Sequence, residues 1–267
     1  MKRIAAALAA VLSCAAGLAQ QPPAKASLGA VTVQATGNPV EKSYRKMVKG
    51  MDLFERMHQL APDAQLRFKL LPRKPGTRLA DIDLEVVGKS FSYRIPIAPD
   101  QTFTLGRDPK ALAEDAVVSP NRRKLTMTWR TDVRTPGLPV GTRRLGDLRL
   151  ECLVGIEAGL VSNSNALTEA LSNFLTDPFR YCGRKEAKYL FFADRPIFGV
   201  TLVAGARRES LDIDQLYAKA IDDPGLKDDL PFCDCEVMLD RTYFLPLGDT
   251  GWPDDTLVQF EYMEDTP

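Results

Sequence analysis

DIDLEVVGKSFSYRIPI, residues 81–97, alternates apolar and polar side chains on both sides of a Gly88-Lys89 turn. Before the turn, Ile82, Leu84 and Val86 alternate with acidic residues. Because successive side chains of a strand point to opposite faces, this period of two predicts two strands that each bury one face. In the second strand the apolar positions are Phe91, Tyr93, Ile95 and Ile97.

The same alternation recurs in four other runs, and Pro, Gly, Asn and Asp residues that favour turns separate them. Strands with one apolar face and short connections are typical of antiparallel sheets. We therefore predict an antiparallel β-sandwich over residues 63–158. The further runs are residues 66–70, 103–105, 125–129 and 148–152.

Residues 91–105 continue the second strand with an extended Ile95-Pro96-Ile97, a turn at Pro99-Asp100-Gln101 and then Phe103-x-Leu105. This segment resembles the hairpin of transthyretin-like and carboxypeptidase-regulatory-type β-sandwiches. Gln101 stands where those proteins have a glycine after the turn aspartate. The resemblance covers only this segment, implies a sandwich fold and carries no functional residues.

An amphipathic helix is predicted before these strands. Asn38 is placed as its N-cap, Pro39 as its first helical residue and Glu41 as a capping-box acid. Apolar residues then recur at spacings of four, three, four and three, which makes one stripe, and the helix should end before Pro62. The stripe consists of Val40, Tyr44, Met47, Met51 and Phe54.

His58, the only histidine, continues this stripe four residues beyond Phe54. A histidine on an apolar helical face is more often packed, with its ring nitrogens bonded to nearby groups, than catalytic or ligand-binding. We therefore expect His58 to be structural.

The last part of the chain mixes helical and strand patterns, with Ser164 and Asp212 as expected helix N-caps and strands expected at 197–203 and 257–262. The predicted fold class is therefore mainly β with an α+β part. We divide the chain into four parts. These are a signal peptide at 1–19, an N-terminal segment with the amphipathic helix at 20–62, the sandwich at 63–158 and a smaller acidic α+β domain with disulfides at 159–267.

The first residues predict export. Lys2-Arg3 is a short basic region, residues 4–12 are apolar, and Gly17-Leu18-Ala19 fits a cleavage site. We expect a periplasmic or secreted protein with no transmembrane span in the mature chain. Cys14 follows Val11-Leu12-Ser13, which loosely resembles a lipobox, so the alternative is a lipoprotein tethered to the membrane through Cys14.

Apart from Cys14, four cysteines remain, and an even number in an exported chain favours two disulfides. A bond between Cys233 and Cys235 would close a very small ring, so we expect each of them to pair with Cys152 or Cys182. The alternatives are a four-thiolate zinc site and a redox-active Cys-x-Cys, although the spacing lacks the short paired knuckles of structural zinc sites. No cofactor is expected.

The formal charge of +0 hides an uneven distribution. Residues 66–150 carry 17 Lys and Arg against 9 Asp and Glu, whereas residues 151–267 carry 10 against 22. Either the two parts are simply solvated or face each other, or the basic part binds an anionic envelope component such as lipopolysaccharide, phospholipid head groups or an acidic glycan. The dispersed basic residues favour the first interpretation, and nucleic acid is not expected as a partner.

The sequence contains no nucleophile elbow, no zinc-binding His-Glu-x-x-His and no Gly-rich phosphate loop. We therefore expect a non-enzymatic binding or structural module of the cell envelope. The alternative is a hydrolase that acts on an envelope glycan or related substrate through two carboxylates. Its candidate catalytic residues are Asp254 or Asp255, beside Trp252, together with Glu236 or Asp240.

Overall fold

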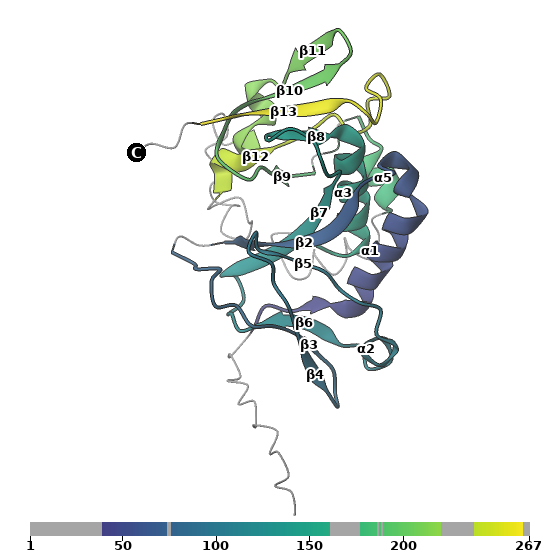
Figure 1. The fold of residues 1–267 in the computed structure, drawn as a ribbon, viewed down its shortest axis with the longest axis vertical. Helices are drawn as coiled ribbons and strands as arrows, with labels where there is room; N and C mark the ends of the chain where they lie inside the picture. The colour runs from purple at the N-terminus through teal and green to yellow at the C-terminus, as the bar shows by residue number, and fades with distance from the viewer. Residues whose placement is uncertain are drawn as a thin grey trace, which may run out of the picture. The chain divides into compact units, whose positions relative to one another are not determined.

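Two long antiparallel strands, β2 (Gln65–Pro72) and β7 (Met127–Arg134), lie in the middle of this computed structural model (Figure 1). They pair along their whole length, and β5 (Thr102–Phe103) pairs with the other edge of β2. The sheet order is β5-β2-β7. The structure describes residues 39–73, 76–160, 177–185, 187, 189–219 and 238–263.

A second antiparallel sheet has the order β1-β6-β3-β4. Its strands are β1 (Lys42–Ser43), β6 (Val117–Pro120), β3 (Leu84–Val87) and β4 (Ser92–Ile95). Apolar side chains from this sheet, such as Val86, belong to one buried cluster with Leu70 and Trp129 of β2 and β7. The alternation in residues 81–97 thus forms two paired strands, as predicted, but in β4 only Ile95 is buried and Tyr93 is exposed.

A third antiparallel sheet has the order β11-β10-β13-β8 and joins distant parts of the chain. Its strands are β11 (Arg207–Ser210), β10 (Ile197–Ala204), β13 (Leu257–Tyr262) and β8 (Thr142–Arg144). Because β8 pairs with β13, the basic part of the chain supplies an edge strand to a sheet of the acidic part. The small pair of β9 (Phe191–Phe192) and β12 (Thr242–Tyr243) is separate.

The segment of residues 91–105 connects two sheets and is not the predicted hairpin. Its strand β4 pairs with β3, whereas β5 pairs with β2. Between them Gln101 has φ 65°, a left-handed conformation, where the resembling proteins have glycine. The turn is closed by the Gln101 amide, which donates to the Ala98 carbonyl at 2.9 Å.

The first helix, α1 (Tyr44–Arg56), begins later than predicted. Its N-cap is Ser43, whose side chain accepts a hydrogen bond from the Lys46 amide at 3.3 Å. The predicted start at Pro39 is wrong because Pro39 forms a β-bridge with Arg123 and Lys42–Ser43 pair with β6. Asn38 lies outside the described residues, and α1 ends before Pro62 as expected. The helix is followed by a 3-10 turn, η1 (His58–Leu60).

Helix α3 (Leu145–Glu157) replaces the strand predicted at 148–152. It contacts α1, β7 and α5 (Pro178–Cys182). Apolar residues lie on nearly all sides of α3, so Leu148, Leu150 and Cys152 also fit the period of a strand. Tertiary packing on all sides therefore made its sequence pattern misleading.

The remaining helical segments are short: α2 (Pro109–Ala113), η2 (Ile213–Gln215), η3 (Tyr217–Lys219) and η5 (Leu239–Arg241). The helix expected after Asp212 is thus reduced to 3-10 turns, although Asp212 does form a capping box with Gln215. The helix expected after Ser164 lies outside the described residues. No helix in the described ranges is long and apolar enough to cross a membrane.

Candidate functional site

The sheet β5-β2-β7 has one apolar face and one charged face. On β2, Phe68 and Leu70 point into the buried cluster, so the intervening Arg67 and Lys69 point to the opposite face. Strand β7 adds its own alternating charged residues to that face: Arg130, Asp132 and Arg134. Part of this charged face is covered by segments of the acidic part of the chain, and cavities lie between them.

The first of these, called here the narrow cavity, has a volume of about 50 Å³. Five cationic side chains line it, together with only three carboxylates. Both parts of the chain contribute, because the lining runs from residues 69–151 to residues 190–241. The cations are Lys69, Arg130, Arg134, Arg143 and Arg241, and the carboxylates are Asp132, Glu151 and Asp194.

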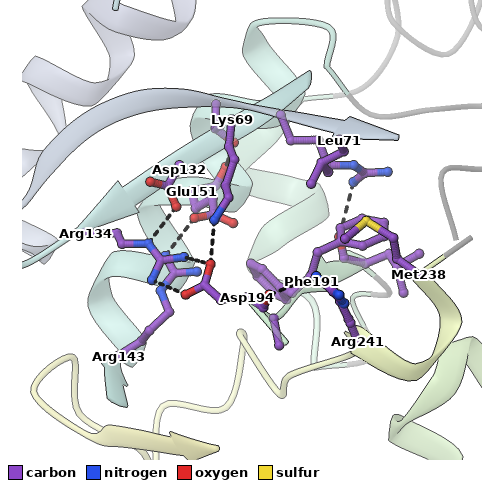
Figure 2. Close-up of a pocket in the computed structure, with 15 residues that line it drawn as sticks. Lys69, Leu71, Asp132, Arg134, Arg143, Glu151, Phe191, Asp194, Met238 and Arg241 are labelled. Atoms are coloured by element: carbon purple, nitrogen blue, oxygen red, sulfur yellow. Dashed lines mark hydrogen bonds and ion pairs between the residues drawn. The ribbon is translucent and has the colours of Figure 1, made fainter. Parts of the chain in front are cut away.

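Asp194, between β9 and β10, connects the two sides of the narrow cavity (Figure 2). Its carboxylate accepts a hydrogen bond from Lys69 Nζ at 2.6 Å and one from each terminal nitrogen of Arg134 at 2.9 Å. Partial burial acts to raise the pKa of Asp194, but the ion pairs with Arg134 and Lys69 outweigh it and hold the pKa well below its usual value. Asp194 therefore stays ionised over the whole neutral and mildly acidic range.

Arg134 is shared between two carboxylates, since its Nε also donates to Asp132 at 2.7 Å. Asp132 in turn accepts from Arg67 at 3.2 Å. These bonds hold the cations of β2 and β7 in fixed positions on one face of the sheet. A preorganised group of cations binds an anion with less ordering cost than flexible surface side chains.

Arg143 and Glu151 form a buried ion pair at the edge of β7. Their residues are 5% and 7% exposed, and Nη2 of Arg143 lies 2.7 Å from Oε2 of Glu151. Burial raises the pKa of the Glu151 carboxyl, against the opposing effects of Arg143 and of the Val133 amide. The pair also satisfies backbone groups at the edge of β7 that has no neighbouring strand in the described part of the chain. Glu151 accepts a hydrogen bond from the Val133 amide, and Arg143 donates one to the Val133 carbonyl.

Two polar atoms near this pair have no hydrogen-bond partner among the described residues: Nε of Arg143 and the hydroxyl of Tyr243. Both side chains are buried, and Arg143 lines the narrow cavity. Burial raises the pKa of the Tyr243 hydroxyl, so this group stays a neutral donor at physiological pH. An unpaired buried donor is costly unless a ligand or water satisfies it.

Arg241, at the end of η5, completes the cationic lining. Its Nη1 donates to the backbone carbonyl of Asp194 at 2.9 Å. Within the described part of the chain, no carboxylate lies at ion-pair distance from Arg241. A guanidinium has five N–H donors, and the described residues accept from only one terminal nitrogen of Arg241.

A second, wide cavity of about 320 Å³ adjoins the narrow one. Lys69, Leu71, Met238 and Arg241 line both. Figure 2 shows Lys69, Arg134 and Asp194 converging on one side, with Met238 and Arg241 on the other. The chemistry that this arrangement supports is the binding of a negatively charged group.

The structure does not bring the predicted catalytic carboxylates together at these cavities. Asp254 forms an ion pair with Arg149 at 2.5 Å, and neither Asp254 nor Asp255 lines the narrow or the wide cavity. Asp240 does line the wide cavity, while Glu236 lies outside the described residues. Trp252 is buried beneath Arg207, whose guanidinium lies 3.6 Å from the ring centre.

Cys152 and Cys182 form a disulfide, with their Cα atoms 6.1 Å apart. This pairing corrects the expectation that each would bond to Cys233 or Cys235, which lie outside the described residues. The reason is that α3 and α5 pack side by side and bring their two cysteines into contact. No group of three or more His, Cys, Asp or Glu side chains in the described residues could hold a metal.

His58 packs as a structural residue. Its Nε2 lies 3.0 Å from the Ala64 carbonyl, and its ring centre is 4.7 Å from that of Phe54. It belongs to η1 and not to the end of α1.

Sequence reasoning identified the basic region but missed the cavity residues. The alternation in residues 66–70 and 125–129 already places Lys69 and Arg130 on polar faces, but it does not extend to Arg134. Nothing local in the sequence indicates that Asp194 and Arg241 cover them. The chain matches no protein-family model, no curated protein and no solved structure.

Proposed function

We propose that this chain is an exported, non-enzymatic binding protein of the cell envelope that holds an anionic group in the narrow cavity. The observation that carries the proposal is the set of five cations facing three carboxylates in that cavity. Ion pairs already fix Lys69 and Arg134, whereas Arg241 forms no ion pair with the described residues and can offer donors to a ligand. Such a site binds and orients an anion without needing a nucleophile.

The charge distribution supports an anionic envelope component as the partner. The cavity lies where basic strands meet a segment of the acidic part, and its own lining is net cationic. Electrostatic attraction of this kind raises the association rate of anions and weakens with added salt.

Export is part of the proposal. A signal peptide at residues 1–19 would direct the chain to the periplasm or the medium, with lipidation of Cys14 as the alternative. The disulfide of Cys152 and Cys182 is compatible with an oxidising compartment. A β-sandwich within residues 63–158 is supported by the core that the sheets of β2 and β3 share.

The test is calorimetric titration of the purified mature chain with inorganic phosphate and with acetate. We expect saturable binding that weakens when NaCl is raised. Arg241→Gln should weaken binding at least tenfold, whereas Arg208→Gln should not change it, because Arg208 lies on β11 and bonds to Gln259 away from the cavity.

Anion binding that is absent, or that is equal in both variants, would overturn the proposal. Turnover of peptidoglycan fragments that is lost in Asp240→Asn would favour the hydrolase instead, because Asp240 is the one of the three described candidate carboxylates that lines the wide cavity.

A further inference from the structure

The wide cavity differs in chemistry from the narrow one. Apolar side chains form much of its wall: Leu71, Pro72, Leu79 and Met238. Its volume of about 320 Å³ lies within the range of small-molecule sites, about 300–1,000 Å³. A small inorganic anion would leave this space and its apolar wall unused.

The charged side chains are distributed unevenly between the two cavities. Of the two, only the narrow cavity is lined by Arg130, Arg134 and Arg143, and three carboxylates there balance them, namely Asp132, Glu151 and Asp194. The cations in excess are therefore Lys69 and Arg241, which line both cavities, and Asp240 lines only the wide one. Asp240 is exposed, so it repels an anion from that end without the cost of a buried charge. An elongated ligand would therefore place its negative charge toward Arg241 and its uncharged part along Leu79.

We propose that the two cavities together bind an anionic amphiphile, with its acidic group at Arg241 and Lys69 and its apolar segment along Leu71, Leu79 and Met238. This inference rests on the proposed function and adds the requirement for an apolar chain. Burial of apolar surface contributes about 25 cal/mol per Å², so the chain would supply affinity that the charge alone does not. The acidic group is a carboxylate, as in a fatty acid, or a phosphate, as in a lipid head group.

The experiment compares five probes: octanoate, octyl phosphate, octan-1-ol, acetate and inorganic phosphate. The octyl anions are used below their critical micelle concentrations. We expect at least one of the two octyl anions to bind tenfold or more tightly than acetate and inorganic phosphate. Tight binding of octanoate alone identifies a carboxylate ligand, and tight binding of octyl phosphate alone identifies a phosphate ligand. Octan-1-ol should bind more weakly than either octyl anion that binds.

Two variants separate the two ends of the ligand. Arg241→Met should weaken the octyl anion at least tenfold and leave octan-1-ol unchanged, and Arg208→Met is its matched control. Leu79→Ser should weaken the binding of the octyl anion and of octan-1-ol and leave acetate binding unchanged. If circular dichroism shows that Leu79→Ser does not fold, Pro72→Ser tests the same wall.

Acetate or phosphate binding as tight as that of the octyl anions would overturn the amphiphile inference and leave the proposed anion site standing. Failure of every anion, with or without octan-1-ol binding, would overturn both.

Discussion

Helices α1 and α3 have the same length of 13 residues but very different surroundings. Five residues of α1 are buried, and they lie on one face. Ten residues of α3 are buried, including Asp147 and Glu151. The comparison shows that a helix with one solvated face can be predicted from the helical spacing of its apolar residues, whereas a helix enclosed by other elements cannot.

The polar residues of α3 explain the misleading pattern. Three of the four form hydrogen bonds to groups outside the helix: Glu151 to Arg143, Asp147 to the amide and hydroxyl of Thr135, and Arg149 to the backbone carbonyls of Leu247, Asp249 and Trp252. A polar residue between apolar ones therefore does not mark a solvated face here. In α3 such a residue marks a partner outside the helix, 8 residues away for Glu151 and about 100 for Arg149.

The largest expected effect is at the buried pair of α3. Glu151→Ala leaves Arg143 charged and buried without its partner, which we expect to lower the free energy of unfolding by about 3–5 kcal/mol. Urea denaturation measures the loss. A change below about 1 kcal/mol would show that Arg143 reaches solvent or another partner and that α3 is less enclosed than described.

The next largest effect is expected from removing the disulfide that links α3 to α5. The double variant Cys152→Ala, Cys182→Ala removes the link to α5 and should cost about 2–4 kcal/mol, because the disulfide restricts the unfolded chain. The control is the wild-type chain unfolded with a reductant present. If reduction and substitution give different midpoints, part of the loss comes from repacking of the buried side chains and not from the missing bond.

Asp194 tests an ion pair of intermediate exposure, with 38% of its side chain exposed. Because its pKa is lower in the folded state, its ion pairs stabilise the fold above the unfolded pKa of about 3.9, and this contribution is lost as the pH falls below that value. Asp194→Asn should therefore cost about 1–2 kcal/mol at pH 7 and less at pH 3.

Thermal unfolding of Asp194→Asn and wild type between pH 7 and pH 2 provides the measurement. The two stability curves should converge on acidification. Parallel curves would show that the Asp194 ion pairs add no stability.

The elements predicted correctly are those in which a single buried face of a sheet or helix determines the spacing of the apolar residues. Val86 and Tyr93 lie on paired strands, and Tyr44 and Met47 lie on the buried face of α1. The cavity depends instead on contacts such as Lys69 to Asp194, which are 125 residues apart. The polar face of β2 was visible in the sequence, but which segment covers it is decided by tertiary packing, on which local periodicity carries no information.

The smallest effect is expected on the solvated side of α1. Arg107 bonds there to Asp52 at 3.0 Å and to Glu55 at 2.8 Å, and its side chain is 40% exposed. Solvent screens exposed pairs and their side chains lose entropy on pairing, so Arg107→Ala should cost at most about 1 kcal/mol in urea denaturation. Its effect should also shrink in 0.5 M NaCl, which the buried pair of Glu151 should not show. Arg107→Ala and Glu151→Ala could instead lower the free energy of unfolding by equal amounts. In that case the distance between the charges, and not their burial, would determine the strength of these ion pairs. The contrast between the two helices would then lose its physical basis.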